Sequence, residues 1–170
     1  SSKLGCLIVE PAGNGLNILS YAMHASAGIR RGEIIALALF SETLGKVVEA
    51  GERKAGLTIH DLHIVMPGGQ PKSQIERFKL ELADPIISKR DIRRLTTKQM
   101  QMPLPEGRQL IASERLHYII DGTSIVQNPK GMRASHLALD ATAMTISDAT
   151  FLNLAEAVQH NHLNLGRIGH

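Results

Sequence analysis

The chain has 170 residues, of which 43% are hydrophobic and 3% aromatic, and its formal net charge is +3. This length suffices for one domain of ordinary size or two small ones, and the scarcity of aromatic residues predicts an aliphatic core. The net charge is too small to indicate, by itself, a protein that binds nucleic acid or a membrane surface. A single cysteine, Cys6, excludes an internal disulfide, and no apolar run is long enough to span a bilayer.

The first third of the chain predicts a β-hairpin and then a helix. Residues 4–9 form a continuous apolar run typical of a buried strand, residues 11–15 are rich in turn formers, and residues 16–23 resume as a strand. Apolar residues then recur at helical spacing over residues 37–55, and Gly56 is suited to end that helix. The expected buried face of the helix consists of Leu37, Phe40, Leu44, Val47 and Val48.

The next segments predict a strand, a turn, and then a strand–helix–strand series. Residues 58–66 favour a strand that ends at the Pro67-Gly68-Gly69 turn. Ser88 can cap a helix over residues 89–100, and residues 108–120 form another long strand. Before that helix, apolar residues expected to point inward alternate with charged residues expected to point outward: Phe78, Leu80 and Leu82 with Arg77, Lys79 and Glu81.

Residues 116–144 are expected to hold the two central strands of the chain. Residues 116–120 are rich in β-favouring types, residues 127–131 form a turn around Pro129, and a period-two apolar pattern follows at Leu137, Leu139, Ala141 and Ala143. Ser147 can then cap a last helix that fades near residues 163–166. The expected buried face of this helix consists of Phe151, Leu154, Ala155 and Val158.

The order of elements predicts an α+β protein with two lobes. The turn at residues 67–69 separates a first lobe, residues 1–67 and 145–170, from an inserted strand–helix–strand–strand module, residues 68–144. The last helix is expected to return to the first lobe, which makes that lobe discontinuous in sequence.

The residues alone indicate a binding module or scaffold and not a self-contained enzyme. The eight histidines suggest no metal site, because His60 and His63 are expected on opposite faces of a strand and His160 and His162 are poorly placed to converge. Cys6 lies in an apolar strand with no evident base, and no paired carboxylates or phosphate-binding fingerprint occur.

A basic patch stands out on the predicted middle helix, formed by Lys89, Arg90, Arg93 and Arg94. A solvated helix face, a protein contact surface and a nucleic-acid site are three readings of such a patch, and the last lacks interleaved aromatic residues. The residues that we expect on the contact surface of the module are Arg77, Lys79, Arg90, Arg93 and Arg94.

Several stretches, in matching order, resemble the FtsA family of bacterial cell-division proteins, which are actin-like ATPase relatives. Ser1-Ser2-Lys3 resembles the end of the family's Asp-Ile-Gly-Ser-Ser-Lys phosphate loop, and residues 26–32 resemble its Ser-Arg-Gly turn. Residues 50–69 resemble its helix, strand and Ser-Gly-Gly turn, with Pro67 replacing serine. Residues 118–132, which end in Gln-Asn-Pro-Lys-Gly-Met, are similar to the family's most recognisable stretch.

The resemblance implies a partial actin-like (ribonuclease H-like) lobe, subdomain 1A, with an inserted subdomain 1C. It makes Ser1, Ser2 and Lys3 partial nucleotide-binding residues. The Asp and Gly that precede them in the family, the second phosphate loop and the adenosine site are expected to lie outside this chain. We therefore expect no enzyme activity, no cofactor and no measurable ATP binding by this chain alone, with ATP and Mg required only by the complete parent protein.

The resemblance also implies a cytoplasmic scaffold at the inner face of the cell membrane at midcell. Such a scaffold self-associates, tethers FtsZ through a lobe outside this chain, and recruits late division proteins such as FtsN through the inserted module. Membrane contact is expected only from a C-terminal helix outside this chain, and no nucleic acid is expected. Two alternatives remain: an actin-like ATPase whose second lobe is missing here, and a basic strand–helix–strand–strand module that binds nucleic acid.

Overall fold

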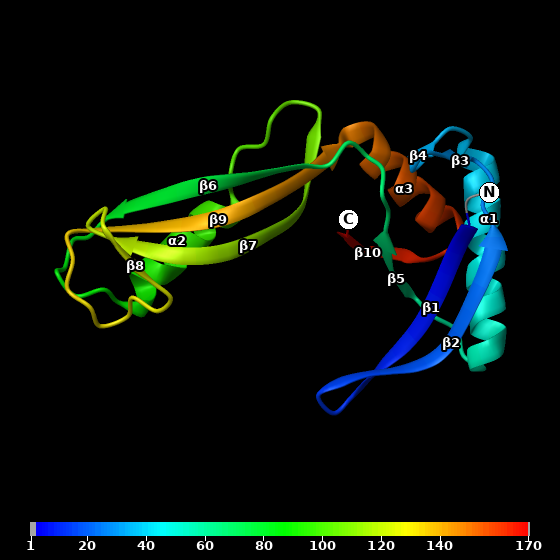
Figure 1. Ribbon diagram of the computed structural model, residues 1–170, viewed down its shortest axis with the longest axis horizontal. Coiled ribbons are helices and arrows are strands. Elements are labelled where there is room, and N and C mark those ends of the chain that lie inside the picture. Colours follow the sequence, from blue (N-terminus) through cyan, green and yellow to red (C-terminus); the bar gives the residue numbers. More distant parts are fainter. Residues whose placement is uncertain (1–2, 170) are drawn as a thin grey trace. The chain divides into compact units, whose positions relative to one another are not determined.

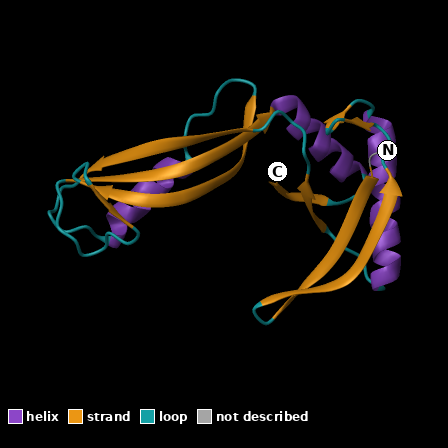
Figure 2. Cartoon of the chain, in the orientation of Figure 1, coloured by secondary structure: helices purple, strands orange, loops and turns teal. Residues whose placement is uncertain are grey.

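The structure, a computed structural model, describes residues 3–169, and the chain divides into two compact units. Residues 1–70 and 147–170 form the first unit, and residues 71–146 form the second, which we call the inserted module. Each unit combines helices with strands, so the predicted α+β class is confirmed (Figures 1 and 2). Within the described residues, no helix has the length and apolar character needed to cross a membrane.

The first unit begins with an antiparallel hairpin of β1 (Lys3–Ala12) and β2 (Gly15–Ala25), which packs on α1 (Leu37–Ala55). Alternate side chains of the hairpin are buried against the helix: Cys6, Ile8, Ser20 and Ala22. The opposite face exposes large apolar side chains, namely Leu7, Val9, Leu16, Ile18, Tyr21 and Met23. The prediction of a buried strand at residues 4–9 is therefore wrong for every second residue, because a helix covers one face of the hairpin only.

The hairpin and α1 approach each other closely at Gly51. The Ser20 hydroxyl donates to the Gly51 carbonyl oxygen at 2.8 Å, and a Cβ at Gly51 would lie 3.2 Å from Cys6 Sγ. Burial, reinforced by the Glu52 carboxylate, raises the pKa of the Cys6 thiol. A neutral, buried thiol packs as a small apolar side chain, which confirms the expected core role of Cys6.

The ends of α1 are those expected from the sequence. Gly56 adopts a left-handed conformation with φ of 72° and donates its N–H to the Glu52 carbonyl oxygen. Ala36 precedes the helix and offers no side-chain cap. Phe40, Leu44, Val47 and Val48 are buried as predicted, whereas Leu37 is only half-buried. A short antiparallel pair, β3 (Ile29–Arg30) and β4 (Glu33–Ile34), lies between the hairpin and the helix.

The chain returns to the first unit through α3 (Asp148–His160), which Ser147 caps as predicted. Leu154 and Val158 are buried, but Phe151 and Ala155 are only partly buried, so that part of the prediction is wrong. The reason is that α3 contacts α1 at Ala157, whose carbonyl oxygen accepts from the Ser41 hydroxyl.

A final strand, β10 (Asn164–Gly169), pairs in parallel with β5 (Asp61–Val65). The sequence predicted a last helix that fades near residues 163–166, and this is wrong, because α3 ends at His160 and residues 164–169 form a strand. β10 has few β-favouring residues, and its hydrogen-bonding partner lies about a hundred positions earlier in the chain. Local sequence could not show that pairing.

The two chain segments that connect the first unit to the module are tied together within the first unit. The Ser147 N–H donates to the Gly69 carbonyl oxygen at 3.1 Å, and the Gly69 N–H donates to Glu33 Oε1 at 3.1 Å. A Cβ at Gly68 would overlap the carbonyl oxygen of Gly32. The Pro67-Gly68-Gly69 turn is therefore needed because two backbones cross there without room for side chains.

The inserted module is a four-stranded sheet with α2 (Lys89–Met100) on one face (Figure 1). The strands lie in the order β6 (Lys72–Glu81), β9 (His136–Ser147), β7 (Arg108–Ile120) and β8 (Ser124–Val126). The core between sheet and helix includes Leu80, Ile87, Leu95, Tyr118, Ile120, Leu137 and Leu139, with Phe78 and Leu82 packed against it. The predicted facing of both alternating strands is confirmed, whereas β8, with three residues, is too short to show a period.

Candidate interaction surface of the inserted module

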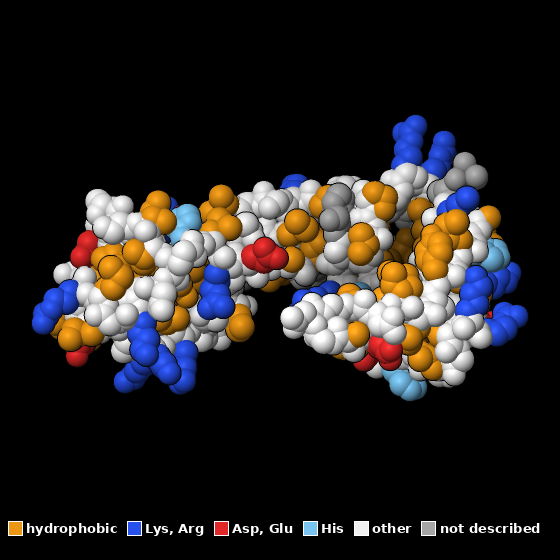
Figure 3. Space-filling view, turned by 60° about the horizontal axis from the view of Figure 1, so that its bottom comes forward, with side chains coloured by type: hydrophobic (Ala, Val, Ile, Leu, Met, Phe, Trp, Pro, Cys, Tyr) orange, Lys and Arg blue, Asp and Glu red, His pale blue; other side chains and the backbone are white. Residues whose placement is uncertain are grey.

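The predicted basic residues of α2 lie on its solvent face. Leu95 and Gln99 are buried on the other face, while the exposed cations are Lys89, Arg90, Arg93 and Arg94. Figure 3 shows lysine and arginine side chains on the surface of the inserted module, the unit that contains α2. Among the four, and within residues 3–169, only Arg94 has an acidic partner: its Nη1 lies 3.9 Å from Asp91 Oδ1.

A capping box fixes the start of α2, which confirms the predicted cap at Ser88. Ser88 Oγ accepts the Asp91 N–H at 3.3 Å, and Asp91 Oδ2 accepts the Ser88 N–H at 3.0 Å. The hydrogen bonds from Ser88 hold the pKa of the Asp91 carboxyl below its usual range. Asp91 is thus ionised and engaged with the helix start, and it does not neutralise Arg90 or Arg93.

The charge pattern of α2 opposes helix stability. Lys89 and Arg90 stand in the first turn, near the positive end of the helix dipole. Two like-charge pairs at i,i+4, Lys89 with Arg93 and Arg90 with Arg94, each destabilise an isolated helix by about 0.2–0.5 kcal/mol. Helix formation therefore does not explain these cations, whereas contact with an anionic partner would.

Arg77 and Lys79 lie on the opposite face of the sheet, because they alternate with Phe78 and Leu80, which pack toward α2. Arg77 makes a bidentate pair with Asp140, with distances of 2.7 Å from Nε to Oδ1 and 2.8 Å from Nη2 to Oδ2. His117 Nε2 lies 3.3 Å from Asp140 Oδ2. The hydrogen bonds from Arg77 hold the pKa of Asp140 below its usual range, so Arg77 is engaged inside the module.

A hollow of about 470 Å³ adjoins this ion pair on the helix-free face of the sheet. Its charged and polar lining is mixed in sign and consists of Arg77, Lys79, Glu81, Asp121 and His136. The structure therefore divides the five predicted contact residues into two separate sets, one on each face of the module. In the sheet set, Arg77 has an acidic partner of its own, which leaves the α2 set as the stronger candidate surface.

Sequence reasoning missed Asp140 and His117 as members of the site. Alternation with Leu139 and Ala141 places Asp140 on the outer face of its strand, but the register that sets it opposite Arg77 depends on strand pairing. Its 5% exposure is the finding that makes this carboxylate unusual. The sequence feature that could have identified Asp140 as a member of the site is the position of this acidic residue in the middle of a largely apolar strand.

The predicted nucleotide-binding residues are only partly placed. Ser1 and Ser2 lie outside the described residues. Lys3 begins β1, and it lines a cavity of about 160 Å³ whose other walls are mainly apolar, including Ile29, Phe40 and Leu154. Nucleotide binding stays a prediction. In the described part of the chain, no three His, Cys, Asp or Glu side chains converge on a metal-sized site.

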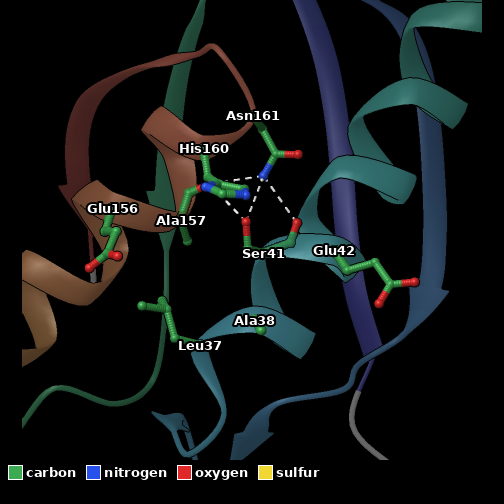
Figure 4. A pocket seen from close by; sticks show the side chains of 8 residues that line it. All are labelled: Leu37, Ala38, Ser41, Glu42, Glu156, Ala157, His160 and Asn161. Atoms are coloured by element: carbon green, nitrogen blue, oxygen red, sulfur yellow. Dashed lines mark hydrogen bonds between the residues drawn. The ribbon is translucent and has the colours of Figure 1, made fainter.

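A second hollow, of about 540 Å³, lies between α1 and α3 in the first unit (Figure 4). Asn161 Nδ2 donates to the Ser41 carbonyl oxygen at 3.0 Å and to the Ala157 carbonyl oxygen at 2.8 Å. Among the described residues, no hydrogen bond joins His160 to Ser41, and Glu42 is turned toward Lys46, 2.6 Å away. Ser41 and Asn161 therefore join two helices, and the arrangement is not that of a nucleophile with its base.

Comparison with known proteins identifies a family match for the inserted module and relatives that match most of the chain. Residues 68–145 match the family model described as the SHS2 domain inserted in FtsA. Curated relatives named cell division protein FtsA match most of the chain: that of Agrobacterium fabrum is 25% identical over 150 residues, covering 88% of this chain and 34% of its own length. The Pseudomonas aeruginosa protein is 20% identical over 169 residues, covering 99% and 40%.

A solved structure described as the PilM–PilN type IV pilus biogenesis complex shares the fold, with a TM-score of 0.51 and 10% identity. The match covers 99% of this chain and 44% of that chain. It supports the partial actin-like lobe with an inserted module that the resemblance implied. This chain spans about a third to two fifths of the length of the curated relatives named above. Residues 68–145 thus match the SHS2 domain inserted in FtsA, and most of the chain is similar to cell division proteins of the FtsA family.

Proposed function

We propose that this chain is part of a bacterial cell-division scaffold of the FtsA kind and that its SHS2 module contacts a partner protein through the basic face of α2. The observation that carries the proposal is the row of exposed, largely unpaired cations on that helix, within the segment that matches the FtsA domain. A surface of this kind attracts an acidic or mixed-charge segment and mainly sets encounter rate and register.

The distribution of charge supports this assignment. Residues 71–146 contain twelve lysines and arginines against eight acidic residues, whereas the remainder of the chain contains seven against eight. The excess positive charge of the chain therefore resides in the module. Asp140 pairs with Arg77 and Asp91 lies near Arg94, so within residues 3–169 these acids leave Lys89, Arg90 and Arg93 without an acidic partner.

In the complete protein, we infer the roles that the FtsA resemblance implies. The scaffold would sit at the inner face of the cell membrane at midcell, self-associate, tether FtsZ through another lobe, and recruit late division proteins such as FtsN through the module. ATP and Mg would belong to the complete protein. The actin-like fold supports an ATPase as the alternative function, with catalysis performed by parts beyond this chain.

Nucleic-acid binding has less support. The module has two aromatic residues, Phe78 and Tyr118, and both pack into its core. No aromatic side chain is thus available beside α2 for stacking on bases.

The test is the double substitution Arg90→Glu/Arg94→Glu in the full-length parent. We expect the circular dichroism spectrum and melting temperature to be nearly unchanged, because exposed charges contribute little to stability. We expect recruitment of a late division protein or self-assembly to be impaired, measured by septation in cells and by pelleting of polymers.

A matched control is Arg53→Glu/Lys72→Glu, which makes the same change in net charge at exposed positions away from α2. This control should divide and polymerise normally. Normal septation and polymerisation by the α2 variant would show that the patch only keeps the protein soluble.

A further inference from the structure

The end of the module beside the start of α2 consists of two loops joined by backbone hydrogen bonds. The Gly131 N–H donates to the Ile87 carbonyl oxygen at 2.9 Å, the Ile87 N–H to the Met132 carbonyl oxygen at 2.9 Å, and the Ala134 N–H to the Pro85 carbonyl oxygen at 2.9 Å. Ile86 and Arg133 are paired in an isolated antiparallel bridge. These bonds make residues 85–88 and 129–134 one structured tip.

The tip buries one set of side chains and exposes another. Ile87 and Ala134 are buried, which anchors both loops to the core. Ile86 and Met132 remain 46% and 41% exposed, although both are large and apolar. Single exposed aliphatic side chains are common on soluble proteins, so the informative feature is that these two lie on two hydrogen-bonded loops beside several cations.

Cations surround the exposed aliphatic side chains. Lys130 and Arg133 flank Met132 in one loop, and Lys89 and Arg90 follow the other loop. None of these four has an ion-pair partner within residues 3–169. The nearby acid Asp84 accepts the Ile86 N–H at 3.0 Å and so faces its own loop. Figure 3 shows basic and apolar side chains close together on this unit.

We propose that this tip binds the surface of a membrane that contains anionic lipids, and that it does so through Ile86, Lys130, Met132 and Arg133. Aliphatic side chains would enter the boundary between headgroups and acyl chains, while the cations attract lipid phosphates. An acidic peptide would satisfy the cations but not Ile86 and Met132, and nucleic acid would lack a stacking partner. Each lysine or arginine near such a surface strengthens binding several-fold.

This inference rests on the tip and does not require the division role or the basic face of α2. It departs from the expectation that membrane contact comes only from a helix outside this chain. A second, weak contact of this kind is consistent with peripheral binding, because one marginal anchor gives only reversible attachment.

The test is flotation of the 170-residue chain with vesicles of phosphatidylcholine alone or mixed equally with phosphatidylglycerol. We expect binding only to the mixed vesicles, weakening as salt rises from about 0.05 to about 0.5 M. Lys130→Glu/Arg133→Glu should weaken it roughly thirtyfold or more. Ile86→Ser/Met132→Ser should weaken it roughly tenfold with every charge retained.

Two control variants test whether vesicle binding depends on the tip itself or only on the total charge and the exposed apolar area of the chain. Arg53→Glu/Lys72→Glu repeats the charge change elsewhere, and Ile75→Ser removes an aliphatic side chain that is 65% exposed on β6. Both should bind like the original chain. Circular dichroism and melting temperature should be unchanged for every variant, and Lys130→Gln/Arg133→Gln replaces the Glu pair if that pair disturbs folding.

Three results would overturn the proposal. The first is no flotation with mixed vesicles at low salt. The second is flotation that either tip variant leaves unchanged, which would mean adsorption through charge elsewhere or without insertion. The third is binding of a polyglutamate peptide, lost in the tip variants, together with no vesicle binding, which would assign the tip to an acidic protein segment. The α2 proposal is tested by septation and polymer pelleting of Arg90→Glu/Arg94→Glu, whereas this one is tested by flotation of the Lys130, Arg133, Ile86 and Met132 variants, so the two can fail independently.

Discussion

The hairpin sheet of the first unit and the four-stranded sheet of the module are each covered by a helix on one face, yet their other faces differ. The hairpin of the first unit exposes a continuous apolar row, in which Leu7 lies opposite Tyr21 and Val9 opposite Ile18. The sheet of the module instead presents Arg77, His117 and Asp140, which satisfy one another. The helix-free face of the module therefore carries an internally paired charge cluster, although Ile75 on the same face is exposed, whereas the open face of the hairpin is apolar along its length.

The difference between these two sheet faces indicates which unit has charged side chains available for binding a partner. Because Arg77, His117 and Asp140 pair with one another, the module needs no partner to satisfy these charges. Its remaining unpaired features, the cations of α2 and the tip, are then available for partners. The apolar face of the hairpin, by contrast, can pack against another apolar surface, but its apolar side chains carry no charge that would select a particular partner.

The largest expected effect is that of Leu139→Ala in the module. Leu139 is 0% exposed and belongs to the core beneath α2. Its truncation should lower the free energy of unfolding of the module by about 2–5 kcal/mol, from lost burial and the cavity left behind. Urea denaturation monitored by circular dichroism measures this change.

The matched control is Leu7→Ala on the apolar face of the hairpin. Leu7 is 54% exposed, so the same truncation should cost less than about 1 kcal/mol. Equal losses for the two variants would contradict the contrast between the covered and open sheet faces.

The next effect concerns the ion pair on the helix-free face of the module. Asp140→Asn should cost roughly 1 kcal/mol at neutral pH, a moderate value because the Arg77 side chain is half exposed. The folded-state pKa of Asp140 is lowered, so its contribution is present at neutral pH and is lost as pH falls below about 4 toward that pKa.

Thermal melts between neutral and acidic pH test this linkage. The original chain should lose stability on acidification more steeply than Asp140→Asn. Parallel pH profiles for the two proteins would show that the pair contributes nothing to stability.

The helix starts offer a third contrast between the units. Ser88→Ala removes the capping box of α2 and should cost about 1 kcal/mol. Ala36→Asp supplies the cap that α1 lacks and should add up to about 1 kcal/mol in the first unit. If the melting temperatures of both variants rose, or both fell, relative to the original chain, the contrast between a capped α2 and an uncapped α1 would be refuted.

The smallest effect on stability is expected on the apolar face of the hairpin. Leu7→Thr/Ile18→Thr should leave the melting temperature nearly unchanged, because both side chains already contact water. The fluorescence of a hydrophobic dye bound to the chain should nevertheless fall clearly. Undiminished dye fluorescence would mean that the dye binds elsewhere.

Elements with a strong local signal were predictable. The bounds of α1 and α2, the cap at Ser88 and the facing of Leu80 and Leu139 follow from periodicity and capping chemistry. β10 was not predictable, since its pairing with β5 joins distant segments. Nor could the exposure of Leu7 be predicted, because an apolar run does not reveal how many of its faces are covered.

The candidate site was predictable only in part. The cations of α2 could be placed from helical spacing alone. The grouping of Arg77 with Asp140 required strand register, which divided the predicted patch into two faces. The tip at Ile86 and Met132 depends on hydrogen bonds between loops about 45 positions apart, for which single-sequence patterns carry no signal.

We expect the inserted module to be a complete domain that carries its own recognition surfaces. The most direct test is the thermal unfolding of residues 68–147 expressed alone, followed by circular dichroism. We predict a cooperative transition and a folded spectrum with both helix and strand. A segment that shows no cooperative transition, while the whole chain unfolds cooperatively under the same conditions, would contradict the claim.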